Sequence, residues 1–380
     1  QQDGERQSLT LVYPSVRAQF VRMSGFSGGP FVLQSLKADG SPIDIGADRP
    51  VVLRTVDDLR LLDRFWGLAN VSLEKLDLSG QEKVLRSMTF DTRTLWPPAN
   101  RLPEGFDPQR ILEEGKHPGL GIRALHAQGI DGRGVRVAII DQPLLRNHRE
   151  YADRLAVYEN QVSGNVPPQM HAPPVASIAV GKSVGVAPEA TLAFFSVPMW
   201  SKDNRPYCTA LERILQLNES AKPAERIRVV SISTGMFPAM DNYDLWKQTL
   251  EKATRSGVLV ITCDPACLRY GSLNRVPGRD PEDPRSYTRG RWISYGMVLL
   301  VPTNRTVASH EGPDVYTYWG EGGLSWAAPY LAGLAALAHQ IHPDLEPQKV
   351  KDLLVQTAAK TDAGPVVNPA GFIAAVRKLP

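Results

Sequence analysis

The chain has 380 residues, of which 42% are hydrophobic, which allows two domains and a sizeable core. Its 43 basic and 40 acidic residues leave a formal net charge of +3, which argues against nucleic acid as a partner. No apolar stretch approaches the roughly 20 residues that a membrane helix needs, so we expect no membrane span.

Residues 1–108 predict a small α+β domain. Short strand-like runs at 9–13 and 50–53 occur with a helical pattern over 56–65. Four prolines between residues 95 and 108 fix φ and remove N–H donors, so we place a linker at the end of this domain.

The sequence from 109 to 380 alternates between apolar runs and helical patterns. These features predict a doubly wound, mostly parallel α/β sheet with helices on both faces, because strands buried on both sides read as continuous apolar runs. The expected strands are 135–140, 191–197, 228–233 and 257–261, and the expected helices lie near 121 and over 209–217 and 243–254.

An acid ends the first of these strands, in Val135-Arg-Val-Ala-Ile-Ile-Asp141. Functional sites in open parallel sheets collect at the carboxyl ends of the strands, so Asp141 is delivered to that edge. Its proposed task is to orient a histidine by accepting a hydrogen bond. The alternative is an ordinary aspartate that caps a loop.

A histidine opens a run of small residues, His171-Ala-Pro-Pro-Val-Ala-Ser-Ile-Ala-Val-Gly181. Prolines at 173 and 174 fit only near a first helical turn, so the His171 ring should sit at a helix entrance. The other six histidines are assigned surface or loop roles.

A serine precedes a helix rich in Ala and Leu. Ser325 follows Gly322 and Gly323, which let a substrate backbone approach, and Pro329 is expected within the first helical turn. The N-terminus of a helix stabilises the negative oxygen of a tetrahedral intermediate. The alternative is that Ser325 only caps the helix.

The chain order Asp141, His171, Ser325 is that of the subtilisin type of hydrolase. Residues 119–358 resemble the subtilisin-like serine protease (subtilase) family. Asp141 stands at that family's Asp motif, and His171 stands where it has His-Gly-Thr before Val-Ala. Ser325 lies in Gly323-Leu-Ser-Trp-Ala-Ala-Pro329, where the family has Gly-Thr-Ser-Met-Ala-Ala-Pro.

Two secondary features agree with this resemblance. Gly185-Val-Ala-Pro188 matches a family turn, and Ser231-Ile-Ser-Thr-Gly235 resembles the strand that pairs with substrate, which implicates Ser233, Thr234 and Gly235 in substrate binding. The resemblance implies a serine endopeptidase acting on protein or peptide substrates. In it Ser325 attacks the carbonyl, His171 transfers the proton and Asp141 orients His171.

One departure concerns the oxyanion site. The family's Asn is missing from Thr262-Cys-Asp-Pro-Ala266, where Asp264 is the nearest polar substitute. An ionised carboxylate would repel the oxyanion, so Asp264 could help only in its protonated form. Loss of one such donor typically lowers turnover by about 100- to 1,000-fold.

The resemblance also bears on metals, processing and location. We expect no cofactor and no metal at the site, and the family's calcium loop is missing after residue 179. Glu150 stands where the family often has a calcium-ligating acid, and we expect it to be a solvated surface acid. Residues 1–108 are either a propeptide or a permanent accessory domain. We expect a secreted or extracytoplasmic protein whose targeting segment is missing from this sequence.

Two further segments leave alternatives open. The stretch 269–291, rich in Arg, Pro, Gly and Asp, is expected to be an irregular surface loop. Cys263 and Cys267 either remain free thiols or form a local disulfide, which requires Cα atoms within about 7 Å.

Three other functions compete with the protease. A pseudoprotease of the same fold would bind a partner protein through the substrate groove, in line with the altered motifs. A nucleotide-binding protein needs a glycine-rich turn after the first strand, but Gly132 and Gly134 precede that strand. An α/β-hydrolase esterase is disfavoured because Ser325 lacks the second elbow glycine and follows the acid and the histidine.

Overall fold

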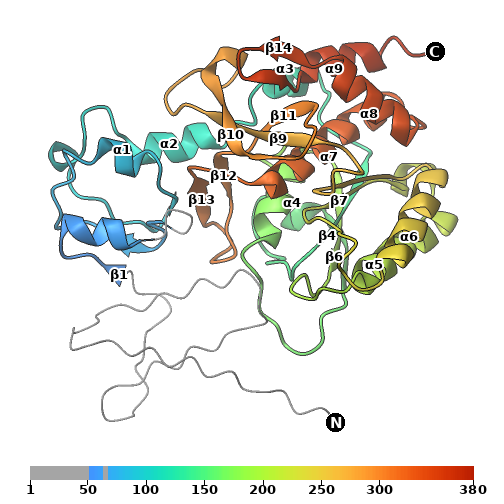
Figure 1. Ribbon diagram of the computed structural model, residues 1–380, viewed down its shortest axis with the longest axis horizontal. Helices are drawn as coiled ribbons and strands as arrows, with labels where there is room; N and C mark the ends of the chain where they lie inside the picture. The colour runs from blue at the N-terminus through green and yellow to red at the C-terminus, as the bar shows by residue number, and fades with distance from the viewer. Residues whose placement is uncertain (1–50, 63–66) are drawn as a thin grey trace.

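The computed structural model describes residues 51–62 and 67–380. Its centre is a parallel sheet of five strands in the order β5-β6-β4-β7-β8 (Figure 1). The strands are β4 (Arg136–Asp141), β5 (Leu155–Asn160), β6 (Thr191–Ser196), β7 (Ile227–Ile232) and β8 (Leu259–Thr262). Four of them correspond to the predicted strands, whereas β5 was not predicted.

Side chains alternate across β4 and bury against two different layers of helices. Val137 and Ile139 belong to a core with α4 (Ala172–Val180) and α7 (Leu324–Ile341). Ala138 and Ile140 belong to a second core, formed with helices on the opposite face. Those helices are α5 (Arg205–Ser220) and α6 (Tyr243–Arg255). The predicted doubly wound α/β architecture is therefore confirmed.

A second sheet of five strands, in the order β10-β9-β11-β15-β14, covers the other side of α7. Its members are β9 (Tyr270–Arg275), β10 (Tyr287–Ile293), β11 (Leu299–Pro302), β14 (Ala359–Thr361) and β15 (Gly364–Val366). The helices nearby are α3 (Ile122–Ala127), α8 (Pro347–Gln356) and α9 (Pro369–Val376).

The expectation of an irregular loop over 269–291 was wrong for 270–275 and 287–291, which are strands, whereas the connection over 276–286 has turns and a short 3₁₀ helix only. β9 and β10 form an antiparallel pair, and β9 also pairs in parallel with β11. Tyr270 and Leu273 are fully buried in this sheet. The Gly, Ser and Asn residues in β9 weaken its sequence signal, since its strand conformation is stabilised by pairing on both edges.

The described part of the N-terminal segment has a core of its own, built around Leu68, Leu73, Leu85 and Phe90. Its elements are β1 (Val51–Val52), η1 (Val56–Leu61), β2 (Val71–Ser72), α1 (Glu82–Leu85), β3 (Phe90–Asp91), η2 (Ala99–Arg101) and α2 (Pro108–Gly115). The expected helix over 56–65 is a 3₁₀ helix where it is described, and the strand predicted at 9–13 lies outside the described residues.

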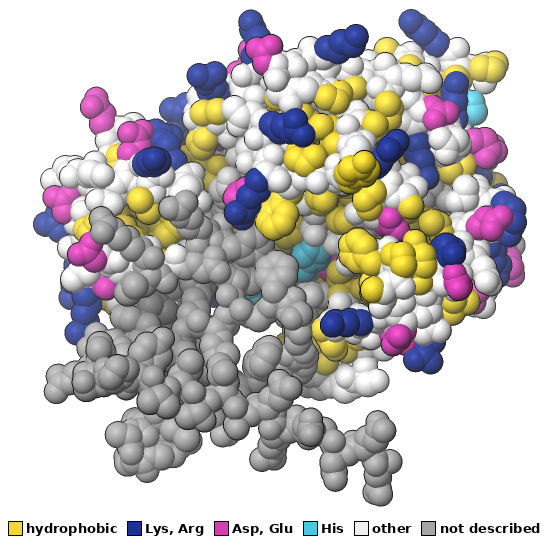
Figure 2. Space-filling model, in the orientation of Figure 1, with side chains coloured by type: hydrophobic (Ala, Val, Ile, Leu, Met, Phe, Trp, Pro, Cys, Tyr) yellow, Lys and Arg dark blue, Asp and Glu magenta, His cyan; other side chains and the backbone are white. Residues whose placement is uncertain are grey.

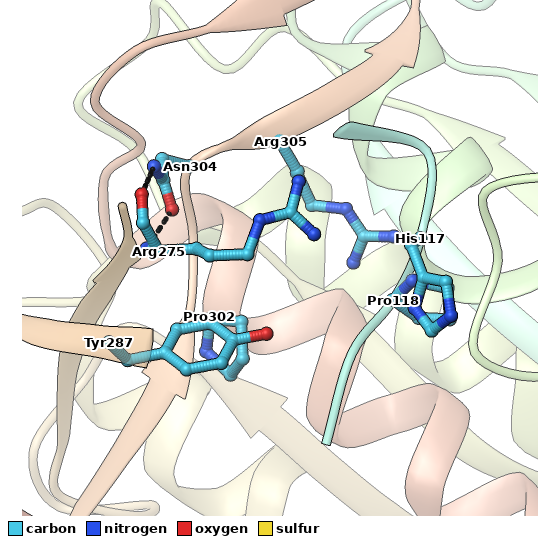
Figure 3. Close-up of a pocket in the computed structure, with 7 residues that line it drawn as sticks. All are labelled: His117, Pro118, Arg275, Tyr287, Pro302, Asn304 and Arg305. Carbon is cyan, nitrogen blue, oxygen red and sulfur yellow. Dashed lines mark hydrogen bonds between the residues drawn. The ribbon is translucent and has the colours of Figure 1, made fainter. Parts of the chain in front are cut away.

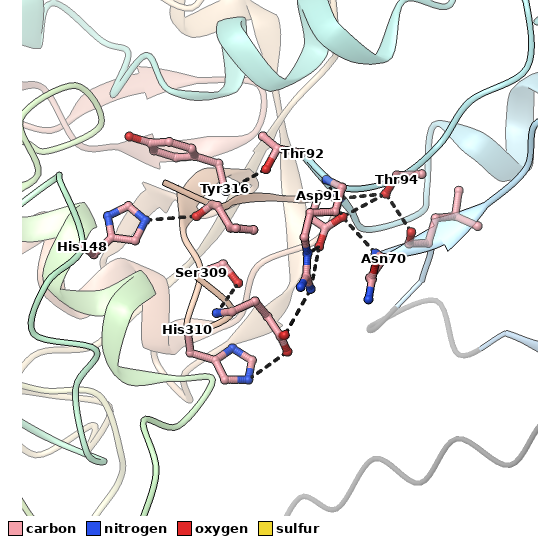
Figure 4. A network of polar contacts seen from close by, with 12 residues as sticks. Asn70, Asp91, Thr92, Thr94, His148, Ser309, His310 and Tyr316 are labelled. Carbon is pink, nitrogen blue, oxygen red and sulfur yellow. Dashed lines mark hydrogen bonds and ion pairs between the residues drawn. The ribbon is translucent and has the colours of Figure 1, made fainter. Parts of the chain in front are cut away.

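One antiparallel pairing joins this N-terminal unit to the α/β unit. β3 adds to the hairpin of β12 (Arg305–Ala308) and β13 (Tyr316–Trp319), with Thr317 opposite Asp91. Figure 4 shows polar contacts across this junction, where Tyr316 N–H donates to Thr92 Oγ1. The two units are thus joined by backbone pairing as well as by the chain.

Among residues 51–62 and 67–380, none of the helices combines the length and the apolar character that crossing a membrane requires.

Candidate active site

Asp141 is the last residue of β4 and is completely buried. Because β4 is the middle strand of the sheet, its carboxyl end opens between the connections from neighbouring strands. Gln142 N–H donates to Asp141 Oδ1 at 2.8 Å, which fixes the orientation of the carboxylate. Both oxygens of the Asp141 carboxylate also face His171.

His171 precedes the first residue of α4, with the two prolines at positions 173 and 174 in the first turn, as the sequence predicts. Its Nδ1 lies 2.9 Å from Asp141 Oδ1 and 3.0 Å from Oδ2. A carboxylate only accepts, so Nδ1 is the protonated nitrogen and Nε2 is left for other partners. The imidazole side chain is 13% exposed, which leaves it accessible from the surface.

Ser325 is the second residue of α7, where N–H groups have no partner within the helix. Its hydroxyl donates to the Ser233 carbonyl at 3.1 Å. Pro329 lies in the second turn rather than the first, as was expected, and it has no N–H for the Ser325 carbonyl. Ser233 Oγ donates to that carbonyl instead, at 2.9 Å.

An aromatic side chain links the imidazole to the start of α7. The Trp326 ring lies 5.3 Å from the His171 ring, centroid to centroid, and Trp326 follows Ser325 directly. Within the described chain, no hydrogen bond joins His171 to Ser325, whose hydroxyl points to Ser233. The structure therefore brings Asp141 and His171 into contact and places Ser325 beside the residue that packs on the imidazole.

The loop after β8 lies next to Ser325. Asp264 Oδ1 accepts from the Ala266 N–H at 2.9 Å, so this carboxylate closes a turn of its own loop. Cys263 N–H donates to the Thr234 carbonyl at 3.0 Å, which ties the loop to the segment 233–235. Burial raises the pKa of the Cys263 thiol to about 12, although side-chain contacts with Tyr270 and Ser325 lower it.

The segment Ser233, Thr234 and Gly235 therefore borders both the loop after β8 and the start of α7. The Phe237 ring packs on Gly235, where a Cβ atom would come within 2.6 Å of the ring. Phe237 is 54% exposed, so its ring is accessible beside this segment. In the face shown in Figure 2, hydrophobic side chains gather towards the middle, with some charged side chains between them.

Sequence reasoning missed three residues of this region: Trp326 as a neighbour of His171, Cys263 beside Ser325, and Phe237. The only sequence signal was their position next to motif residues.

The subtilase family model matches residues 132–264 and 301–372, which is more than half of the chain. The chain belongs to the subtilase family. The match stops at Asp264 and resumes within β11, so it leaves out the rest of the loop after β8 and the β9–β10 hairpin.

Curated relatives agree with this membership of a family of serine proteases. The chain is 28% identical over 284 residues to subtilisin-like protease PopC of Myxococcus xanthus, covering 63% of this chain and 58% of PopC. It is 26% identical over 304 residues to serine protease AprX of Bacillus subtilis, covering 67% of this chain and 68% of AprX. This subtilase thus spans little more than half the length of PopC.

Two solved structures share the fold. The subtilase cytotoxin SubAB matches with a TM-score of 0.55 and 18% identity, over 70% of this chain and 96% of that chain. The A-subunit of the AB5 toxin from E. coli matches with a TM-score of 0.55 and 18% identity, over 69% and 98%. At this identity the likeness concerns the fold alone.

Glu150 is not the solvated surface acid that we expected, because it is 2% exposed. Its carboxylate accepts from the backbone and side chain of Ser183, from Val184 N–H and from the Tyr316 hydroxyl. Burial raises the pKa of Glu150, but these hydrogen bonds outweigh it and hold the pKa below its usual value. In this subtilase, protein donors thus surround the Glu150 carboxylate.

All three cysteines of this subtilase are free, namely Cys208, Cys263 and Cys267. In the part of the chain that the structure describes, no three His, Cys, Asp or Glu side chains gather closely enough to hold a metal ion.

Proposed function

We propose that this subtilase is an endopeptidase that cuts peptide bonds through Asp141, His171 and Ser325. The observation that carries the proposal is the contact of His171 Nδ1 with both oxygens of the buried Asp141 carboxylate, at 2.9 and 3.0 Å. A carboxylate placed in this way fixes the imidazole tautomer and stabilises the imidazolium that forms during turnover.

In the proposed reaction, the Ser325 hydroxyl turns from the Ser233 carbonyl towards His171 Nε2. Ser325 Oγ attacks the substrate carbonyl while Nε2 takes its proton. The protonated imidazole then passes this proton to the leaving amine, and water hydrolyses the acyl-enzyme by the same steps. The packing of the imidazole on Trp326, the residue after Ser325, supports this step because it places His171 near the start of α7.

The oxyanion is proposed to face the Ser325 N–H at the start of α7, where the helix dipole favours negative charge. Asp264 is the candidate second donor, from its free carboxyl oxygen and only in the protonated form. The other oxygen of Asp264 accepts a hydrogen bond from the Ala266 N–H. This contact favours the ionised carboxylate, which could not donate to the oxyanion. We therefore expect this protein to turn over substrate more slowly than a subtilase that has both oxyanion donors.

We propose that substrate pairs with the segment Ser233, Thr234 and Gly235, with the exposed Phe237 ring beside it. The partners are protein or peptide substrates and not nucleic acid, given the balanced charge of the chain. We also propose that the protein is secreted or extracytoplasmic, because proteases of the subtilase family are typically found outside the cell.

The N-terminal unit to residue 108 is proposed to be a domain distinct from the catalytic domain at 109–380, either a propeptide or a permanent accessory domain. The core around Leu68, Leu73 and Phe90 supports a separate unit, and it also takes in Ile111 and Leu112 of α2 and Tyr318 of β13. The pairing of β3 with β13 supports lasting association, since strand pairing adds backbone hydrogen bonds.

A pseudoprotease is the second candidate, because the Ser325 hydroxyl is bonded to Ser233 and the family's oxyanion Asn is missing. A fluorophosphonate probe separates the two functions, since it labels only an activated serine. We expect labelling of the intact protein and of the control Ser220→Ala, which removes an exposed hydroxyl at the end of α5, but not of Ser325→Ala. Equal absence of labelling in all three would favour the binding protein.

A further inference from the structure

A small cavity lies between the connection from α2 to α3 and the strands β9, β10, β11 and β12. Its volume is about 10 Å³, and it is lined by His117, Pro118, Arg275, Tyr287, Pro302, Asn304 and Arg305. Figure 3 shows the guanidinium groups of Arg275 and Arg305 reaching into the same space, with His117 on the opposite side. None of these residues belongs to the proposed catalytic site.

Arg305 brings a buried positive charge to this cavity, and its guanidinium lies over the Tyr330 ring, 6.0 Å from the ring centroid. The residue is 2% exposed, and one of its terminal nitrogens donates to the Val184 carbonyl. Its Nε and Nη1 are buried without any hydrogen-bond partner within the described chain. Burial lowers the pKa of Arg305 to about 10, which still leaves it cationic at neutral pH. A buried charge with two unused donors is unfavourable unless an acceptor meets it.

The neighbouring side chains add positive charge rather than remove it. Arg275 is 8% exposed, and its Nη2 donates to the neutral Glu114 carbonyl at 2.8 Å. Within residues 51–62 and 67–380, neither Arg275 nor Arg305 forms an ion pair with a carboxylate. Burial, with the cationic Arg123 next in effect, lowers the pKa of His117 to about 4, so this ring is neutral at pH 7.

Glu282, at the His117 side of the cavity, forms no ion pair with either guanidinium group in the described part of the chain. Glu282 accepts from the Gly121 N–H through one carboxyl oxygen, and the other lies 3.1 Å from His117 Nε2. Asn304 is also engaged, because its side-chain amide exchanges two hydrogen bonds with the Arg275 backbone (Figure 3). Among the described residues, the protein therefore supplies an acceptor for Arg305 Nη2 but none for its Nε and Nη1.

We propose that this cavity binds one monatomic anion, chloride under ordinary conditions, held by the guanidinium groups of Arg275 and Arg305. The small size of the cavity favours a monatomic anion over a polyatomic one, because a volume near 10 Å³ has room for a single particle of about the size of water. Phosphate, sulfate and carboxylates have several heavy atoms and exceed it. We name this cavity the halide site.

The halide site would connect parts that are distant in the sequence. Arg305 is the first residue of β12 and Arg275 the last of β9, while His117 lies between α2 and α3. An anion in the halide site would reduce the repulsion between the guanidinium groups of Arg275 and Arg305. These groups lie next to the segment that connects α2 with α3. Halide binding should thus stabilise the folded protein, because a ligand of the native state alone shifts the unfolding equilibrium.

Bromide provides the direct test, since its anomalous scattering distinguishes it from water. We expect crystals of the full chain grown in sodium bromide to show an anomalous peak in the halide site. Absence of a peak there would overturn the proposal in favour of a bound water molecule.

A titration in solution gives a second readout that needs no crystals. At constant ionic strength, replacing gluconate with chloride should raise Tm by about 2 °C for each tenfold increase in chloride above its Kd. Arg305→Met should lose this response, whereas Arg213→Met, which alters an exposed arginine paired with Glu159, should keep it. If Arg305→Met does not fold, the chloride dependence of the wild-type Tm and the bromide peak still test whether the halide site binds an anion. A chloride effect that gluconate reproduces, or one that Arg305→Met retains, would contradict the proposal.

Discussion

Ser233 and Ser325 exchange two hydrogen bonds: each hydroxyl donates to the backbone carbonyl of the other residue, at 2.9 and 3.1 Å. The pair joins the end of β7 to the start of α7, two segments about 90 residues apart in sequence. Pro329 is the reason that this link is needed, because it cannot supply the helical N–H that the Ser325 carbonyl would otherwise receive. The proposed nucleophile is thereby anchored through its own backbone.

Ser233→Ala should therefore destabilise the fold as well as the site. The Ser325 carbonyl would lose its partner, and an unsatisfied polar group costs about 1 kcal/mol or more. We expect the free energy of unfolding, measured by chemical denaturation, to fall by about that amount, with a parallel loss of peptide hydrolysis. Ser220→Ala is the matched control. Full stability of Ser233→Ala would show that the carbonyl finds another partner.

Asp264→Asn should raise turnover. The amide oxygen can keep the turn by accepting from Ala266 N–H, while its NH₂ group offers the oxyanion a donor. Because one such donor is worth about 100- to 1,000-fold in turnover, we expect kcat to increase at least about tenfold. Asp264→Ala serves as the control without a donor. If Asn and Ala variants turned over equally slowly, Asp264 would not face the oxyanion.

Glu150→Gln should lower stability at neutral pH by about 2 kcal/mol, since a buried carboxylate with charge-assisted hydrogen bonds is replaced by an amide that also presents donors. The sign of the pH effect follows from the lowered pKa of Glu150 in the folded state. Its contribution is present above the unfolded pKa and disappears as the pH falls through the folded value. Denaturation curves of the two proteins should converge in acid. Parallel curves down to pH 3 would contradict this role.

His339 should make the protein sensitive to mild acid. Burial, and then the cationic Arg228, lower its pKa from 6.5 to about 4, although its ring bonds to the Pro343 carbonyl. Below about pH 6.5 the unfolded chain takes up a proton that the folded protein does not, so stability decreases towards pH 4. The effect amounts to about 2 kcal/mol between pH 7.5 and pH 5.

Comparison with His339→Gln isolates this residue from the other buried histidines. The variant should lose less stability between the two pH values, by roughly the same 2 kcal/mol. An unchanged pH dependence would mean that His339 titrates alike in both states.

Several parts of the structure follow from local sequence. The strand ending at Asp141 could be predicted because a strand buried on both faces must be apolar throughout. The entrance of α4 could be predicted because Pro173 and Pro174 fit only a first turn. The family motif then located the three proposed catalytic residues. The contact between His171 and Asp141 agrees with the positions predicted for them, at the end of a strand and at the start of a helix.

Other features depend on partners far away in the chain. β9 forms a strand because β10 and β11 pair with both of its edges. Glu150 is buried because Ser183 and Tyr316, the latter 166 residues later, provide its donors. No local pattern contains these partners.

The sequence by itself determined the α/β class, the family and the identity of the residues proposed to react, because hydrophobic periodicity and compact motifs are local properties of the chain. Only the tertiary structure decided that the Ser325 hydroxyl faces Ser233, that protein donors satisfy Glu150, and that two donors of the buried Arg305 meet no acceptor among the described residues. Hydrogen bonding and desolvation depend on which groups meet in space, and that is settled when distant segments pack together.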